Sequence, residues 1–146
     1  MKKKLLILLA ACLLCMAGIA AADADQADPG AVSSLLSQRL EHMNLKPQPL
    51  EKGENSALKG ERYVLAFSGG TLELFAYRDE DGAARDLLTV DESGLLVAQA
   101  AVDWGGDPHF FLRDNVIVLY VGENSKVLDM LERLCGPQIR GARTQL

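Results

Sequence analysis

The segment Asp103-Trp104-Gly105-Gly106-Asp107-Pro108-His109 brings two aspartates and a histidine together beside the chain's single tryptophan. Carboxylates and an imidazole can ligate a metal ion, and Trp104 with the following Phe110 would supply an apolar wall beside them. A metal site needs three or four converging donors, and no second cluster completes a shell here. A small metal-dependent enzyme using Asp103, Asp107 and His109 is therefore the alternative hypothesis, and we expect neither a metal nor another cofactor.

The same segment suits a contact surface better than it suits catalysis. Aspartates beside glycines commonly accept turn amides, and a tryptophan in a glycine-rich loop is typical of protein contact sites. Acid–base or nucleophilic chemistry needs a partner that the sequence places beside neither histidine, and no G-x-S-x-G elbow is present. We therefore predict a binding surface, without catalysis, made of Asp103, Trp104, Asp107, His109 and Phe110.

Three further groupings have ordinary structural explanations. Gly69-Gly70 lacks the surrounding pattern of a phosphate loop and predicts a hairpin turn. The acidic run 79–82 lacks the ligand spacing of a calcium loop and predicts a capped helix start. Cys135 lies on the apolar stripe of the last predicted helix, which favours inert packing over a reactive or dimer-forming thiol.

The N-terminus predicts export. Lys2, Lys3 and Lys4 precede an uncharged apolar run, residues 5–22, that closes on three alanines before an aspartate. That order is typical of a secretory signal cleaved after Ala20 or Ala22. The run is just long enough for a transmembrane anchor, but its exit carries small residues and acids instead of a basic or aromatic flank.

Lipid attachment is a second interpretation of the same stretch. Leu9-Ala10-Ala11-Cys12 fits the lipoprotein pattern, although the apolar run continues past Cys12. Membrane association is expected only if Cys12 is lipidated or if the signal stays uncleaved. The predicted location is therefore exported, meaning periplasmic, cell-surface or secreted, with a lipid anchor as the alternative.

The charge balance narrows the class of partner. Without residues 1–22 the chain keeps 12 basic and 20 acidic residues, a net charge of −8. A surface of this sign is repelled by nucleic acid and by anionic lipid. Cys135 is then the only cysteine, so no intramolecular disulfide can form. We expect an exported, envelope-associated binding module for a protein or small ligand, or alternatively an inhibitor of an envelope enzyme.

The elements that would position these residues alternate in a simple order. Helical spacing, turn residues and apolar runs predict helices over 29–43, 83–88 and 125–135 and strands over 62–67, 72–77, 109–112 and 115–121. The strand at 115–121 is apolar on both faces, which predicts a central position covered on both sides, or nearly so. Residues 95–102 fit a strand or a loop equally well.

These elements predict an α+β fold built from two ββα units after an N-terminal helix. The expected architecture is a two-layer sandwich, with a mainly antiparallel sheet of four to five strands and helices on one face. The predicted organisation is a signal peptide at 1–22, a linker at 23–30, one domain at 31–138 and a frayed tail at 139–146.

Several short blocks carry a family resemblance. They are Gly69-Gly70-Thr71-Leu72-Glu73, Val102-Asp103-Trp104, Pro108-His109-Phe110-Phe111, Ile117 to Gly122, and Leu134 with Gly136-Pro137-Gln138. In these blocks the chain resembles a set of small, uncharacterised bacterial exported proteins and lipoproteins. The resemblance covers the chain from about residue 69 onward, and the stretch from Trp104 to Gly122 is its specific part. It implies a compartment and a fold, and it implies no mechanism.

Overall fold

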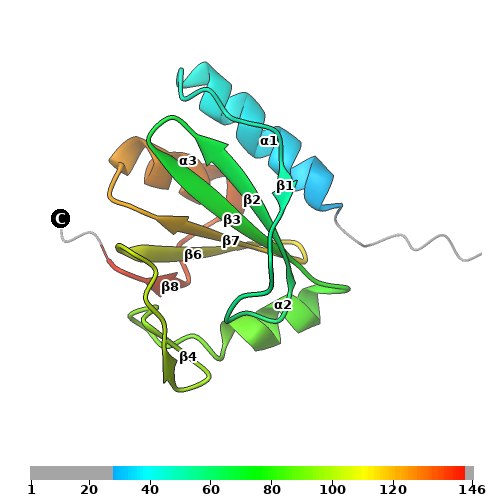
Figure 1. Cartoon of the computed structure of the whole chain (residues 1–146), viewed down its shortest axis with the longest axis vertical. Helices are drawn as coiled ribbons and strands as arrows, with labels where there is room; N and C mark the ends of the chain where they lie inside the picture. The colour runs from blue at the N-terminus through cyan, green and yellow to red at the C-terminus, as the bar shows by residue number, and fades with distance from the viewer. Residues whose placement is uncertain (1–27, 144–146) are drawn as a thin grey trace, which may run out of the picture.

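The computed structural model describes residues 28–143 and consists of three helices and eight strands within that range (Figure 1). In chain order the elements are α1 (Pro29–His42), β1 (Glu51–Lys52), β2 (Glu61–Phe67), β3 (Gly70–Ala76), α2 (Glu80–Leu87), β4 (Leu96–Val97), β5 (Ala100–Ala101), β6 (Pro108–Arg113), β7 (Val116–Val121), α3 (Ser125–Cys135) and β8 (Arg140–Gly141).

The main sheet is antiparallel and has the strand order β1-β2-β3-β7-β6-β8. Two hairpins, β2–β3 and β6–β7, form its centre and join through β3 and β7, where Leu74 lies opposite Val118. The two ββα units and the α+β class predicted from the sequence are therefore confirmed. The sheet has six strands because the short strands β1 and β8 extend its two edges. A separate hairpin, β4–β5, occupies the segment that the sequence left open.

Local side chains explain why the helices begin where they do. Asp28, Asp79 and Asn124 each precede a helix, and each side chain accepts a hydrogen bond from an amide of the first turn, at 2.9, 2.6 and 3.1 Å. Such caps satisfy amides that lack a partner inside the helix. At the other end, Gly136 has a φ of 86°, so α3 ends at a residue that tolerates the left-handed region.

The sheet has an apolar cluster on each face. Adjacent residues of β7 point in opposite directions, so Val118 belongs to one cluster while Ile117 belongs to the other. Residues of α1 and α3 pack in the first cluster, and Ala83 and Leu87 of α2 pack in the second. Figure 1 shows α2 well apart from α1 and α3. The expected two-layer sandwich with all helices on one face is therefore corrected: α2 covers the opposite face, as the fully apolar β7 requires.

The C-terminal segment contains strand β8 within the range, from residue 139, where the sequence predicts a frayed tail. Strand β8 pairs with β6, and the Arg140 guanidinium donates to the Val90 carbonyl at 3.1 Å. Gly141 has a φ of 106°, and a Cβ there would lie 2.0 Å from the Pro108 carbonyl oxygen, so only glycine permits this close approach. The segment up to residue 143 thus completes the sheet edge.

Some sequence predictions concern other parts of the chain. The signal at 1–22, the lipidation candidate Cys12, linker residues 23–27 and the end of the tail at 144–146 lie outside the described residues. Between residues 28 and 143, no helix has both the length and the apolar character that a bilayer crossing demands.

Candidate functional site

The two aspartates of the predicted surface are exposed and support the turn. Asp103 accepts the Gly105 amide at 2.9 Å through Oδ1, and the Asp107 carbonyl accepts the Gly122 amide at 3.0 Å. The Asp103 contact is the side-chain turn role that the residue type suggests, whereas Asp107 takes part through its backbone. Neither carboxylate contacts the His109 side chain by any hydrogen bond within residues 28–143.

Trp104 holds the loop before β6 against the second cluster. Its indole N–H donates to the Gly94 carbonyl at 2.7 Å, and its ring meets Phe110 edge-on, with centroids 5.7 Å apart and an interplanar angle of 75°. Phe110 itself is completely buried. An aromatic pair of this geometry stabilises packing, and the partly buried indole N–H has a hydrogen-bond partner. Trp104 therefore connects the segment before β4 to the sheet.

His109 lies on the opposite face of β6 from Phe110 and is only 3% exposed. Its ring stacks on Tyr120 at 6.2 Å, and its Nδ1 lies 2.9 Å from Gln138 Oε1. The Gln138 amide N–H donates to the Ala142 carbonyl, so Oε1 faces the histidine and Nδ1 carries the proton. His109 thus ties β6 to the segment that leads into β8, which is a structural role.

The predicted surface is therefore divided between two faces of the sheet. Trp104 and Phe110 belong to one face, His109 belongs to the other, and only the two aspartates lie open to solvent. Among residues 28–143, no group of three or more histidine, cysteine, aspartate or glutamate side chains is arranged to hold a metal ion. Within those residues, the metal-dependent alternative therefore has no set of converging donors. The five residues of the predicted contact surface also do not form one continuous surface, because they lie on two faces of the sheet.

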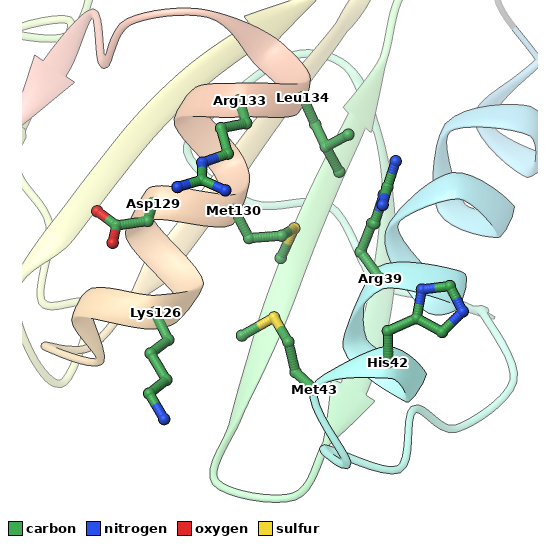
Figure 2. A pocket seen from close by; sticks show the side chains of 8 residues that line it. All are labelled: Arg39, His42, Met43, Lys126, Asp129, Met130, Arg133 and Leu134. Carbon is green, nitrogen blue, oxygen red and sulfur yellow. The ribbon is translucent and has the colours of Figure 1, made fainter.

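A different surface gathers side chains from distant parts of the sequence. A groove of about 590 Å³ lies between the last turn of α1 and the length of α3. We call it the α1–α3 groove and define it by its lining residues: Arg39, His42, Met43, Lys126, Asp129, Met130, Arg133 and Leu134. Figure 2 shows Arg39 and His42 on α1, Met43 immediately after it, and the other five on α3.

The floor of the α1–α3 groove is apolar. Met43 and Met130 extend toward each other between the two helices, and Leu134 lies beyond them (Figure 2). Met130 is 7% exposed, and Met43 and Leu134 are half-buried and pack against the first cluster. The chain has four methionines, and the two that lie within residues 28–143, Met43 and Met130, both line the groove. Methionine is flexible and polarizable, so such a floor can adapt to differently shaped apolar groups.

The rim of the α1–α3 groove is predominantly cationic. Arg39, Lys126 and Arg133 are exposed, and Asp129 is the only acid among the lining residues. The ion pairs found between residues 28 and 143 are Lys52–Glu61 and Arg62–Glu73, so the three rim cations have no anionic partner there. An unpaired positive rim on a chain of net charge −5 is a local reversal of sign.

Lys126 occupies a position that a helix disfavours for a cation. It is the second residue of α3, close to the positive end of the helix dipole. A lysine there costs about 0.3–1 kcal/mol relative to a neutral or acidic residue. Helix stability alone therefore does not favour a lysine at this position of the groove rim.

Two buried groups elsewhere serve the structure. Asp86 is 6% exposed, and its Oδ2 accepts both the Lys59 amide and the Tyr77 hydroxyl at 2.6 Å. Burial, and then the bond to Asp86, raises the pKa of Tyr77 well above its ordinary value. Burial also raises the pKa of the Cys135 thiol to about 11, which lowers the fraction of thiolate at neutral pH. Cys135 packs against the first apolar cluster, which agrees with the packing role predicted for it.

Comparison with protein-family models, with curated proteins and with solved structures found no match to this chain.

Proposed function

We propose that the protein is an exported binding module of the bacterial cell envelope that holds an anionic, amphipathic ligand in the α1–α3 groove. The observation that carries the proposal is the combination of a methionine floor with an unpaired cationic rim. Binding pockets are commonly concave and apolar, with a few polar groups that fix the orientation of the ligand. The groove has this composition, and the role is binding without catalysis.

The electrostatics supports selectivity by charge. Because the chain as a whole is acidic, an anionic ligand is repelled by most of the surface and attracted at the groove rim. Arg39 and Arg133 stand on different helices, so a ligand between them meets positive charge from both sides. The apolar part of the same ligand would then cover Met43 and Met130.

The envelope location is supported by the N-terminal sequence and by the family resemblance. Three lysines, an apolar run and an alanine exit are typical of a cleaved signal. Intact mass of the protein recovered from its host tests this directly. A chain that begins at residue 21 or 23 agrees with export, a lipid-modified chain that begins at Cys12 indicates an anchored form, and the full-length mass contradicts both.

The methionine methyl groups report on the groove itself. We suggest isotope labelling of these methyls and titration with anilinonaphthalene sulfonate, which joins one sulfonate to an apolar ring system. Both groove methionines should shift along one saturable curve, and Arg39→Glu with Arg133→Glu should weaken the interaction about tenfold. The matched control is Arg78→Glu with Arg85→Glu, an equal charge change at exposed sites outside the groove.

Two outcomes of this titration would contradict the proposal. One is that the dye leaves both methionine signals in place at saturating concentration. The other is that the control pair of substitutions weakens binding as much as the groove pair does.

A further inference from the structure

The cations of the α1–α3 groove lie on both of its sides. Arg39 stands on α1, whereas Lys126 and Arg133 stand on α3 (Figure 2). The two cations of α3 are seven positions apart in the sequence, which corresponds to about two helical turns or about 10 Å along the axis. The groove therefore presents an apolar strip about two turns long, with positive charge on each flank.

From this arrangement we infer that the occupant of the α1–α3 groove is an amphipathic helix of a partner protein with acidic residues on both flanks of its apolar stripe. This inference rests on the proposed function and specifies its ligand. A helix in a groove uses apolar anchors at i, i+3 or i+4, and i+7, which span two turns. Met43, Met130 and Leu134 offer contacts for two or three such anchors.

Charge complementarity favours a helix over a single-chain amphiphile such as a fatty acid. A fatty acid brings one carboxylate, which can neutralise one cation and leaves the cation on the opposite rim unpaired. A helix with glutamates on both flanks can meet Arg39 on one side and Lys126 with Arg133 on the other. The floor is also open and only three apolar side chains long, so an acyl chain would remain largely in water.

Asp129 refines the expected pattern. It is exposed on α3 between Lys126 and Arg133, one turn from each. A helix docked along α3 would therefore place its acids opposite Lys126 and Arg133 and a neutral or basic residue opposite Asp129. Like charges directly opposed across an interface discriminate against wrong partners.

The test uses the protein expressed from its full-length coding sequence and two synthetic helical peptides. Both peptides have about 16 residues and leucine anchors at i, i+3 or i+4, and i+7. One carries glutamates on the flanks, and the other carries lysines at the same positions. Dodecanoate serves as the fatty acid probe. Affinities are measured by calorimetry at low ionic strength, where exposed ion pairs contribute most.

The acidic peptide should bind in the micromolar range, and the basic peptide and dodecanoate should each bind about tenfold more weakly. Substitution R39E with R133E should reverse the preference between the two peptides, and R78E with R85E should leave it unchanged. The four positions are exposed, so these variants should fold, and circular dichroism checks that they do.

Each remaining outcome overturns the inference. Equal affinity for the two peptides would remove the role of the flanking acids, and tighter binding of dodecanoate would assign the groove to an acyl chain. Self-association that R39E with R133E abolishes would make the occupant a second copy of this chain. If the dye titration shifts both methionines while the acidic peptide fails to bind, the proposed function stands and this inference alone fails.

Discussion

Replacement of Trp104 by alanine should lower the free energy of unfolding by about 3 kcal/mol while the α1–α3 groove stays competent to bind. The sequence alone predicts the opposite result, because it places Trp104 on the contact surface. In the structure, Trp104 packs edge-on against buried Phe110 and donates its indole N–H to Gly94. Its loss therefore opens a space in the second cluster and removes a hydrogen bond.

The magnitude follows from two contributions, side-chain packing and one hydrogen bond. Truncation of a fully buried tryptophan costs about 3–5 kcal/mol, and Trp104 is half-buried, so about 2 kcal/mol is expected from packing. The indole hydrogen bond contributes about 1 kcal/mol, since the Gly94 carbonyl loses this donor. The edge-to-face pair with Phe110 is already included in the packing contribution, so the expected total is about 3 kcal/mol.

The assay is urea denaturation followed by far-ultraviolet circular dichroism, because Trp104 is the only tryptophan and cannot serve as the probe in its own variant. Trp104→Phe is the matched control, since it keeps one aromatic ring against Phe110 and loses the indole donor together with the second ring. That variant should lose about 1–2 kcal/mol. A Trp104→Ala protein within about 0.5 kcal/mol of the original stability would refute the packing role.

Three further predictions address other parts of the fold. Tyr77→Phe should lower the free energy of unfolding, measured by heat or urea, by about 2 kcal/mol, because the buried Asp86 carboxylate loses a hydroxyl donor at 2.6 Å. An unchanged free energy of unfolding would show that Asp86 does not need this bond. Ala98→Asn with Gln99→Gly should raise stability by about 1–2 kcal/mol, since both turn residues have positive φ, 47° and 67°, where asparagine and glycine are favoured; a loss of stability would contradict that backbone geometry. Burial raises the pKa of the Cys135 thiol from 9.0 to about 11, so the unfolded chain releases this proton first, and the free energy of unfolding should fall as pH rises from about 9 to 11. Tyr77, whose pKa burial and the bond to Asp86 also raise, adds its own fall in stability from about pH 10 upward. Cys135→Ala should therefore make the fall between about pH 9 and 10 clearly shallower in pH-dependent denaturation, and an unchanged slope in that range would assign it to another group.

The elements that the sequence predicts well are those with local signals. Asp28 and Asn124 cap helices, and Gly136 ends one, because each satisfies a local backbone requirement that the residue type reveals. The hairpin at Gly69 follows from the same kind of local chemistry. The apolar sequence of β7 also predicted correctly that this strand is central and that both of its faces are covered.

The elements that were missed lack a local signal. The turn between β4 and β5 uses Ala98 and Gln99 in place of the usual asparagine and glycine, so its sequence does not resemble a hairpin turn. Strand β8 is two residues long and depends on the close approach of Gly141 to β6. Neither a short strand nor a distant backbone contact leaves a periodic pattern.

The candidate site shows the same division. Trp104 and His109 lie close together in the sequence, on either side of one turn. Because adjacent residues of β6 point to opposite faces, His109 lies on one face of the sheet, whereas Phe110 lies on the other face with Trp104. The α1–α3 groove joins Arg39 to Arg133, which are far apart in the chain and meet only because α1 and α3 pack on the same face. Sequence spacing could not reveal a surface that the packing of two distant helices creates.

The most direct test of the binding role is site-specific photo-crosslinking in the host. A photoreactive amino acid is placed at His42, an exposed groove residue, or at Leu88, which is 72% exposed on the opposite face of the sheet. The position in the groove should give a discrete adduct whose crosslinked partner peptide is acidic and amphipathic, and R39E with R133E should abolish it. Equal adducts from both positions, or an adduct from Leu88 alone, would contradict a binding site between α1 and α3.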